Sequence, residues 1–203
     1  MRIPKVILIG GAPIVGKSAA ARQLAVRLEY GCFSTDDLNQ AVRAATSRES
    51  HPAFHTMDGL DYREYYISHS VDQLINDADQ YHKALWEPVK EVIKAHATWG
   101  SSTVIEGWSL QPEKVMDLGM VEVQSVWLVA DRNLFEARVR CKPDFFRGAS
   151  NEGQMIRHFL ERSVIFNERI RETAGRLGLP LIEVTETDSP AEICERCYCL
   201  LCR

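Results

Sequence analysis

The chain has 203 residues, of which 45% are hydrophobic and 26% are charged, and its formal net charge at pH 7 is −4. This length suits one well-packed domain, residues 1–203, and no linker or internal repeat divides it. The negative charge argues against a nucleic-acid partner, and no run of about twenty apolar residues could cross a membrane. We therefore expect a cytoplasmic protein with free thiols rather than disulfides.

A short apolar run, residues 6–9, leads into a glycine-rich loop and then into a segment with helical periodicity. The loop fits the pattern G-x-x-x-x-G-K-[ST] at every fixed position. Its backbone N–H groups would surround phosphate oxygens, its lysine would reach the outer phosphates, and its serine hydroxyl would ligate Mg²⁺. The residues predicted to bind nucleotide are Gly11, Ala12, Pro13, Ile14, Val15, Gly16, Lys17, Ser18 and Ala19. Ile14 stands where many such loops carry glycine, so we expect its backbone to avoid positive φ.

Two aspartates follow a second predicted strand, residues 31–35, at the strand end where parallel sheets bind ligands. A helix is expected over 38–46. We assign Asp36 as the functional carboxylate and Asp37 as a helix cap or a substrate contact. The alternative is that both residues only cap the helix. Arg43, further along, is a candidate partner for a substrate carboxylate or phosphate.

Residues 47–99 are expected to form a helical insertion over the site. The segment 47–60 is rich in turn formers and holds His51 and His55, for which a surface or structural role is the commoner case. Helices are expected over 61–78 and 79–98, the first opened by a capping box of Asp61 and Glu64. Aromatic residues here are expected to supply packing, with one or two rings available to line a pocket: Tyr62, Tyr65, Tyr66, Tyr81, Trp86 and Trp99.

A third predicted strand, 102–106, ends in Glu106-Gly-Trp108. An acidic residue at this edge is placed to hold a magnesium-bound water near Ser18. The alternative is that the Glu106 carboxylate is only a structural hydrogen-bonding group at the end of the strand. Trp108 is a candidate wall of a substrate pocket. With further strands at 121–130 and 181–185, the alternation of strands and helices predicts an α/β sandwich around a five-stranded parallel sheet.

Positive charge is concentrated in residues 132–176, which hold ten basic and six acidic residues, so the remainder of the chain carries −8. A segment that closes over polyphosphate needs such an excess of cations. We expect an arginine-rich lid at 132–162, with Arg138 and Lys142 as catalytic cations. Further candidates to face phosphate are Arg132, Arg147, Arg157 and Arg162. Within the lid, 141–150 is expected to be a mobile segment that exposes Phe145 and Phe146.

The C-terminal stretch holds four of the six cysteines, at positions 194, 197, 199 and 202, with a spacing that zinc sites also use. The same stretch has the pattern of a helix begun by Ser189, with Pro190 in the first turn and Glu192 completing a capping box. On one helix the two cysteine pairs point in different directions, so packing is expected rather than a metal site.

Together GGAPIVGKS, STDDLNQAVR, STVIEGWSLQPEKV and RSVIFNERIRETAGRLGLPLIEV resemble the 2-phosphoglycerate kinase-like branch of the P-loop kinases, relatives of gluconate and shikimate kinases. The resemblance implies a three-layer α/β/α fold, ATP and Mg²⁺ as ligands, and a small, anionic hydroxyl acceptor. It implies that Asp36 contacts or deprotonates that hydroxyl, while Lys17 and the lid cations neutralise the transferring phosphoryl group.

Other nucleotide-binding classes fit less well. The Asn-Lys-x-Asp and Asp-x-x-Gly motifs of GTPases are absent from the sequence. Two alternatives stay open, a nucleoside or polynucleotide 5′-hydroxyl kinase and a regulatory module that binds ATP without transferring its phosphate.

Overall fold

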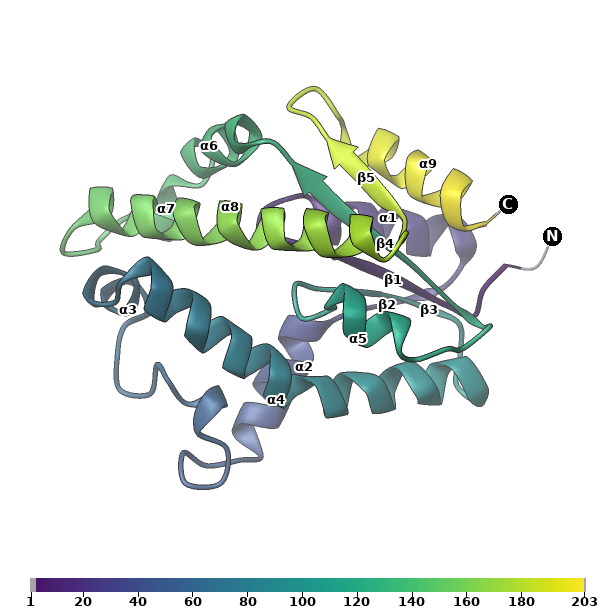
Figure 1. The fold of residues 1–203 in the computed structure, drawn as a ribbon, viewed down its shortest axis with the longest axis horizontal. Helices are drawn as coiled ribbons and strands as arrows, with labels where there is room; N and C mark the ends of the chain where they lie inside the picture. The colour runs from purple at the N-terminus through teal and green to yellow at the C-terminus, as the bar shows by residue number, and fades with distance from the viewer. Residues whose placement is uncertain (1–2, 203) are drawn as a thin grey trace.

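The structure is a computed structural model that describes residues 3–202. Its strands form one parallel sheet in the order β2-β3-β1-β4-β5 (Figure 1). The strands are β1 Val6–Gly11, β2 Gly31–Ser34, β3 Thr103–Glu106, β4 Val123–Ala130 and β5 Leu181–Val184. The predicted five-stranded parallel sheet is thereby confirmed.

The central position of β1 follows from its sequence. Every residue of this strand is buried, because helices cover both faces of the sheet, and a strand covered on both sides needs a continuous apolar run rather than an alternating one. In the ladder, Ile9 lies opposite Glu106 of β3 and Val126 of β4. This register brings the ends of β1 and β3 to the same edge of the sheet.

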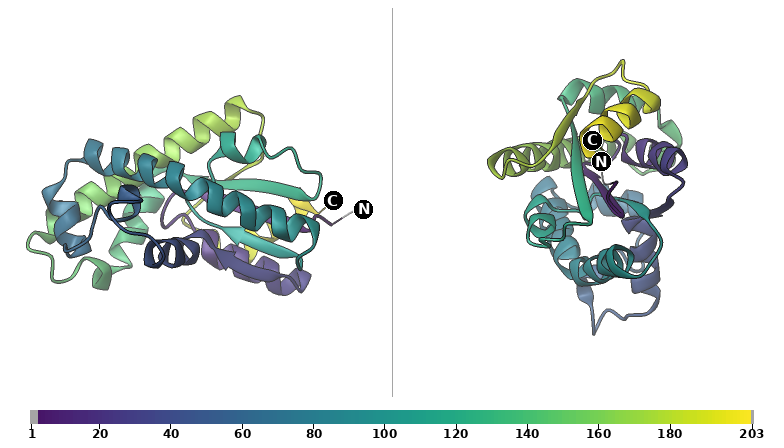
Figure 2. Two further views of the ribbon diagram at one scale, coloured as in Figure 1. Left: turned by 90° about the horizontal axis from the view of Figure 1, so that it is seen from below. Right: turned by 90° about the vertical axis from the view of Figure 1, so that its right-hand side faces the viewer.

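Helices form the two outer layers. One layer contains α1 Lys17–Leu28 and α9 Pro190–Leu201, which pack against each other. The other contains α4 Val71–Thr98, α5 Pro112–Met116 and α8 Glu152–Arg176, while α2 Thr35–Ala44 contacts α4 beside β2 (Figure 2). None of the helices described for residues 3–202 has the length and apolarity that a bilayer crossing needs.

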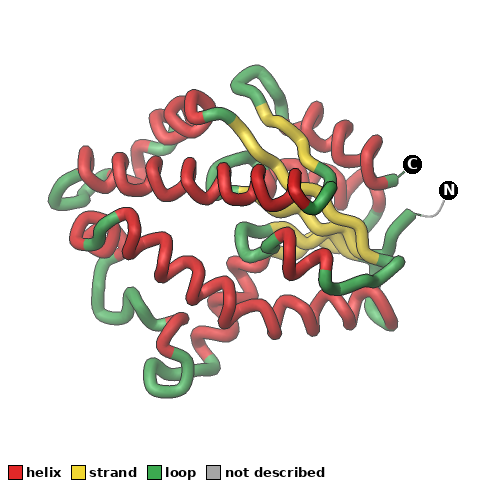
Figure 3. The backbone as a smooth tube through the Cα atoms, in the orientation of Figure 1, coloured by secondary structure: helices red, strands yellow, loops and turns green. Residues whose placement is uncertain are grey.

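Beyond the carboxyl ends of the strands, helices build a second, smaller apolar cluster. It joins α3 Tyr62–Ser68, α4, α6 Arg132–Arg140, α7 Pro143–Phe146 and α8. Its buried members are Tyr65, Tyr66, Leu74, Val139, Phe146, Met155 and Phe159. The segment between α2 and α3 is mostly loop, with one short 3₁₀ turn, Pro52–Phe54 (Figure 3). Helices from the segments 47–99 and 132–162 therefore share one core.

Two predicted helix starts were wrong because a serine caps each helix earlier in the chain than expected. The Ser34 hydroxyl accepts a hydrogen bond from the Asp36 N–H at 3.2 Å, so α2 begins at Thr35 and neither aspartate is its cap. Likewise Ser70 caps α4 by accepting from the Gln73 N–H. The two helices expected over 61–78 and 79–98 are accordingly divided at residues 69–70.

Three further expectations need correction. Glu64 does not complete a capping box with Asp61, because its carboxylate accepts hydrogen bonds from Ser150 instead. Phe146 is 3% exposed rather than open, since it packs in the smaller cluster, while Phe145 is 37% exposed. Trp99 supplies no core packing and is 83% exposed.

The C-terminal helix is as predicted, with Ser189 and Glu192 in a reciprocal capping box. Cys194, Cys197 and Cys202 are buried in the main core. Within residues 3–202, no three or more His, Cys, Asp or Glu side chains are grouped in a way that could hold a metal ion.

Candidate active site

The nine residues predicted to bind nucleotide span the end of β1, the following loop and the first turn of α1. The Lys17 ammonium lies inside this loop and donates to the Ala12 carbonyl at 2.7 Å. Burial lowers the pKa of Lys17 to about 8, although the nearby carboxylates of Glu106 and Asp36 act in the opposite direction. A buried ammonium beside the positive end of a helix is suited to binding phosphate.

Ile14 departs from its predicted conformation. Its φ is +57°, in the left-handed region that costs a residue with a side chain about 1–2 kcal/mol. Its carbonyl accepts a hydrogen bond from Arg138 Nη1 at 2.8 Å, and its side chain packs against both apolar clusters. These contacts hold the loop in a conformation that local sequence preference alone would not select.

Gly16 lets Arg138 approach the phosphate loop. A Cβ atom on Gly16, whose φ is +108°, would lie 3.1 Å from Arg138 Nη1. Arg138 therefore lies across the loop beside the position where phosphates are expected. Lys142, the other predicted catalytic cation, is exposed and lines a small cavity beside Ile14.

Three other arginines of the predicted lid segment lie elsewhere. Arg132 forms ion pairs with Glu136 and Glu161 on the surface. Arg147 pairs with Asp144. Arg157 is exposed and does not line the main cavity.

Ser18 and Glu106 meet at the mouth of the loop. The Ser18 hydroxyl donates to Glu106 Oε1 at 2.9 Å. Both groups are hard oxygen ligands at the positive end of α1, which is the chemistry that Mg²⁺ prefers. Directly after Glu106, a Cβ on Gly107 would lie 1.7 Å from the Thr35 hydroxyl, so only glycine lets the exits of β2 and β3 come this close.

That close approach carries Asp36 toward Lys17 and Glu106. Asp36 is exposed as a whole residue, but desolvation of its carboxyl beside the cavity raises the pKa. Lys17 opposes this shift, while Glu106 and Asp37 add to it. A carboxylate with a raised pKa is a better proton acceptor. Asp37 is exposed on the first turn of α2 and does not line the cavity.

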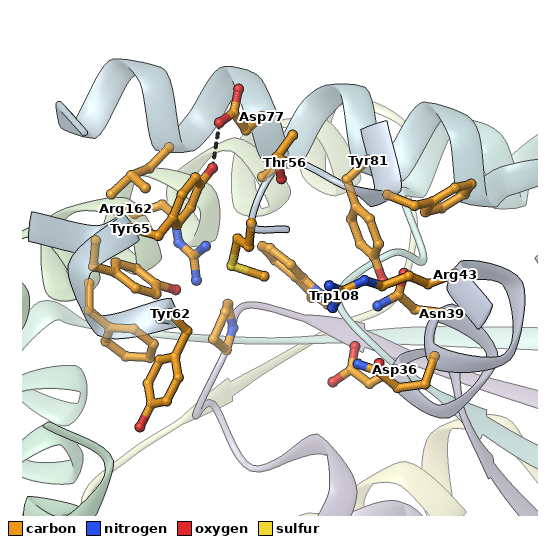
Figure 4. A pocket seen from close by; sticks show the side chains of 18 of the residues that line it. Asp36, Asn39, Arg43, Thr56, Tyr62, Tyr65, Asp77, Tyr81, Trp108 and Arg162 are labelled. Atoms are coloured by element: carbon orange, nitrogen blue, oxygen red, sulfur yellow. Dashed lines mark hydrogen bonds between the residues drawn. The ribbon is translucent and has the colours of Figure 1, made fainter. Parts of the chain in front are cut away.

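A cavity of about 520 Å³ opens beside the phosphate loop. Asp36, Asn39 and Arg43 of α2 lie along one side of it, and Tyr62, Tyr65 and Arg162 lie along the other, with Trp108 between them (Figure 4). Lys17, Ser18 and Glu106 also line this cavity. The nucleotide end and the aromatic end thus belong to one continuous space.

Of the two arginines that line this cavity, one is paired with an acidic side chain and the other is not. Arg43 is paired with Asp58, which also accepts from His55 Nδ1 at 2.7 Å, so this network gives His55 a structural role. Arg162 has no acidic side chain within ion-pair distance among residues 3–202. Its guanidinium lies over the rings of Tyr66 and Trp108, each with its centre 4.9 Å away. Arg162 is thus an uncompensated positive charge in an aromatic wall.

Trp108 is held by residues that no sequence motif indicated. The Gln111 side-chain NH₂ donates to the Trp108 carbonyl at 2.9 Å and to His82 Nδ1 at 3.2 Å. The His82 ring packs edge-on against Trp108 with centroids 4.4 Å apart. Burial lowers the pKa of His82 to about 3, so this ring is neutral and acts in packing. Only the three-dimensional neighbourhood of Trp108 reveals these partners.

Hydrogen bonds join α3 to the segment 145–154. The Tyr62 hydroxyl donates to the Phe145 carbonyl at 2.8 Å, and Glu64 accepts from both the N–H and the hydroxyl of Ser150. The Gln154 side chain donates to the Ile67 carbonyl at 3.0 Å. Because α3 also lines the cavity, these bonds couple that wall to residues 145–154.

Comparisons with known proteins agree with this architecture. No family model matches the chain. Curated proteins named 2-phosphoglycerate kinase do match, confirming the resemblance seen in the sequence. The protein from Pyrococcus horikoshii is 25% identical over 93% of the chain and 62% of its own length. The one from Methanothermobacter thermautotrophicus is 29% identical over 92% of the chain and 64% of its own length. The chain therefore spans less than two thirds of these relatives.

Solved structures with the same fold include two kinases. A gluconokinase from Sinorhizobium meliloti superposes with a TM-score of 0.58 at 16% identity, covering 100% of this chain and 94% of that one. The shikimate kinase from Aquifex aeolicus gives 0.54 at 15% identity, covering 97% and 95%. These similarities establish the fold as the α/β/α sandwich of P-loop kinases.

Proposed function

We propose that the chain is an ATP-dependent phosphotransferase that moves the γ-phosphoryl group to a hydroxyl of a small, anionic metabolite. The supporting observation is that Lys17, Ser18, Asp36 and Glu106 line one cavity whose far wall carries the uncompensated Arg162. The curated relatives named 2-phosphoglycerate kinase make 2-phosphoglycerate the first acceptor to test. In this proposal residues 47–99 are the acceptor-side insertion and residues 132–162 are the lid.

The reaction uses groups already in place. Asp36 orients the acceptor hydroxyl and takes its proton as the hydroxyl oxygen bonds to the γ-phosphorus. The bond between that phosphorus and the β–γ bridging oxygen breaks, and ADP leaves. Lys17 and Arg138 neutralise the charge that spreads over the transferring group. Ser18 and Glu106 would hold Mg²⁺, which when bound neutralises part of the phosphate charge.

Arg162 gives the proposal its preference for an anionic acceptor. An unpaired guanidinium in a partly enclosed, aromatic-lined site favours a carboxylate or phosphate, to which it can make two parallel hydrogen bonds. Arg43 is less available because Asp58 already compensates its charge. The acceptor would therefore place its hydroxyl at Asp36 and its anionic group at Arg162.

The direct test measures ADP release from Mg·ATP with and without a panel of hydroxylated metabolites that includes 2-phosphoglycerate. Stimulation by one compound supports a kinase. Slow turnover that no acceptor changes would instead indicate an ATPase or a regulatory module. Nucleosides and 5′-hydroxyl oligonucleotides belong in the same panel, because stimulation by these would favour the alternative acceptor classes.

A further inference from the structure

Buried polar atoms without partners are grouped around Trp108. Such atoms include Thr35 Oγ1, Asn39 Oδ1, His82 Nε2 and Arg162 Nε. Thr35 contacts the neighbouring Gly107, the His82 ring packs on the indole, and Arg162 lies over it. Buried polar groups are almost always hydrogen-bonded, so a group of exceptions beside a cavity indicates a polar ligand or ordered water there.

Of these four residues, only Asn39 and Arg162 line the cavity, and the proposed reaction does not use Asn39. It lies on α2 three residues after Asp36, and both side chains line the cavity (Figure 4). Residues at this spacing have Cβ atoms about 5–6 Å apart on one helix face. A hydrogen bond of about 2.7–3.0 Å from each side chain then brings their targets onto neighbouring atoms of one small molecule.

The chemistry of the carboxamide suits a neighbouring oxygen. Its oxygen can accept from a hydroxyl, and its NH₂ group can donate to a phosphate or carboxylate oxygen after half a turn about the terminal bond. A charged residue at this position would favour one of these substituents and exclude the other. The amide is therefore the neutral group that accommodates either.

We propose that Asn39 is a specificity-determining residue that binds an oxygen substituent on the carbon next to the phosphorylated hydroxyl. The acceptor class is thereby narrowed to small acids with two neighbouring oxygens, one of which receives the phosphoryl group. This inference rests on the proposed kinase function and adds the requirement for the second oxygen.

Three acceptors that differ only at carbon 2 test the proposed role of Asn39. Glycerate, 2-phosphoglycerate and 3-hydroxypropionate share a terminal CH₂OH and a carboxylate, and carry a hydroxyl, a phosphate or only hydrogens at carbon 2. We expect Asn39→Ala to lower kcat/KM about 10- to 100-fold for the acceptors with a carbon-2 oxygen and less than about 3-fold for 3-hydroxypropionate. Asn76→Ala, which removes an exposed amide on α4, should change none of the three.

Asn39→Asp gives a second, nearly isosteric readout. Its carboxylate can still accept from the glycerate hydroxyl but repels a phosphate, so the loss should be greater for 2-phosphoglycerate than for glycerate. Calorimetric ATP affinity, which should equal that of the unmodified chain, monitors folding in each variant.

An equal loss on all three acceptors, or no loss, would overturn the role of Asn39 while leaving the kinase function intact. If the unmodified chain transfers phosphate to none of the three, the acceptor class in the proposed function fails, and this inference with it.

Discussion

The lowered pKa of Lys17 predicts that ATP binding takes up a proton and weakens as pH rises. In the free protein, burial holds this pKa at about 8, against about 10.4 for an ordinary lysine. A bound phosphate favours the charged ammonium, so it raises the pKa in the complex. Above pH 8 the Lys17 side chain of the free protein is mostly uncharged, so it must gain a proton when ATP binds.

The magnitude follows from the titration curve. With a pKa of about 8, about nine tenths of the free protein carries charged Lys17 at pH 7 and about one tenth does at pH 9. The affinity for Mg·ATP should therefore fall about tenfold over this interval, which corresponds to about 1.4 kcal/mol. Half a proton should be taken up per ATP bound at pH 8.

Isothermal titration calorimetry in buffers of different ionisation heat measures both quantities. Lys17→Arg is the matched control, because its guanidinium stays protonated over the whole range and should remove the pH dependence. An affinity that is constant from pH 7 to 9, without proton uptake, would refute the reasoning, since Lys17 would then be charged before binding or would not contact phosphate.

Three further substitutions test separate parts of the structure. Arg162→Gln should raise the acceptor KM about tenfold or more in steady-state kinetics while ATP affinity stays unchanged, because a charged hydrogen bond to the acceptor is lost. Glu64→Ala should speed amide hydrogen exchange at Ser150 and in the adjoining lid, since that N–H loses its acceptor. Asn167→Ala should lower the free energy of unfolding in urea by about 2–3 kcal/mol, because the buried N–H of Ala130 loses its partner.

Each of these substitutions has a control. Arg162→Lys, which keeps the charge, should recover part of the acceptor affinity, and an unchanged KM in Arg162→Gln would remove Arg162 from the acceptor site. Glu87→Ala breaks an ion pair within α4 and should leave lid exchange unaltered. Glu172→Ala on the exposed face of α8 should cost little stability, and an equally small loss in Asn167→Ala would contradict its role at the end of β4.

The central fold could be predicted because its signals are local in sequence. The continuous apolar run of β1, the loop motif and the helix after it lie within residues 6–28, and the capping box of α9 lies within four residues. Long-range contacts gave no comparable signal. Glu64 accepts a hydrogen bond from Ser150, 86 residues away. The Ile14 carbonyl, in a backbone with positive φ, accepts a hydrogen bond from Arg138.

The sequence could indicate which residues lie at the site, but not which of them are free to bind a ligand. Asp36 follows β2 and Glu106 is the last residue of β3, and these parallel strands end at one edge of the sheet, so topology brings the two residues together. The sequence could not show that Asp58 compensates Arg43 while Arg162 stays unpaired, because ion pairing depends on side chains from different elements. Asn39 belongs to no motif, and the helix expected over 38–46 left out Asp36. The helix face that the two residues share follows only from the observed start of α2 at Thr35.

Following the fate of the γ-phosphate by ³¹P NMR, with the acceptor that most stimulates ADP release, tests the central claim most directly. The unmodified chain should convert the γ-phosphate resonance into a phosphomonoester of the acceptor. Asp36→Asn should form none while binding Mg·ATP with nearly unchanged affinity. Release of inorganic phosphate at the same rate with and without acceptor would contradict the account, as would phosphoryl transfer by Asp36→Asn at the full rate.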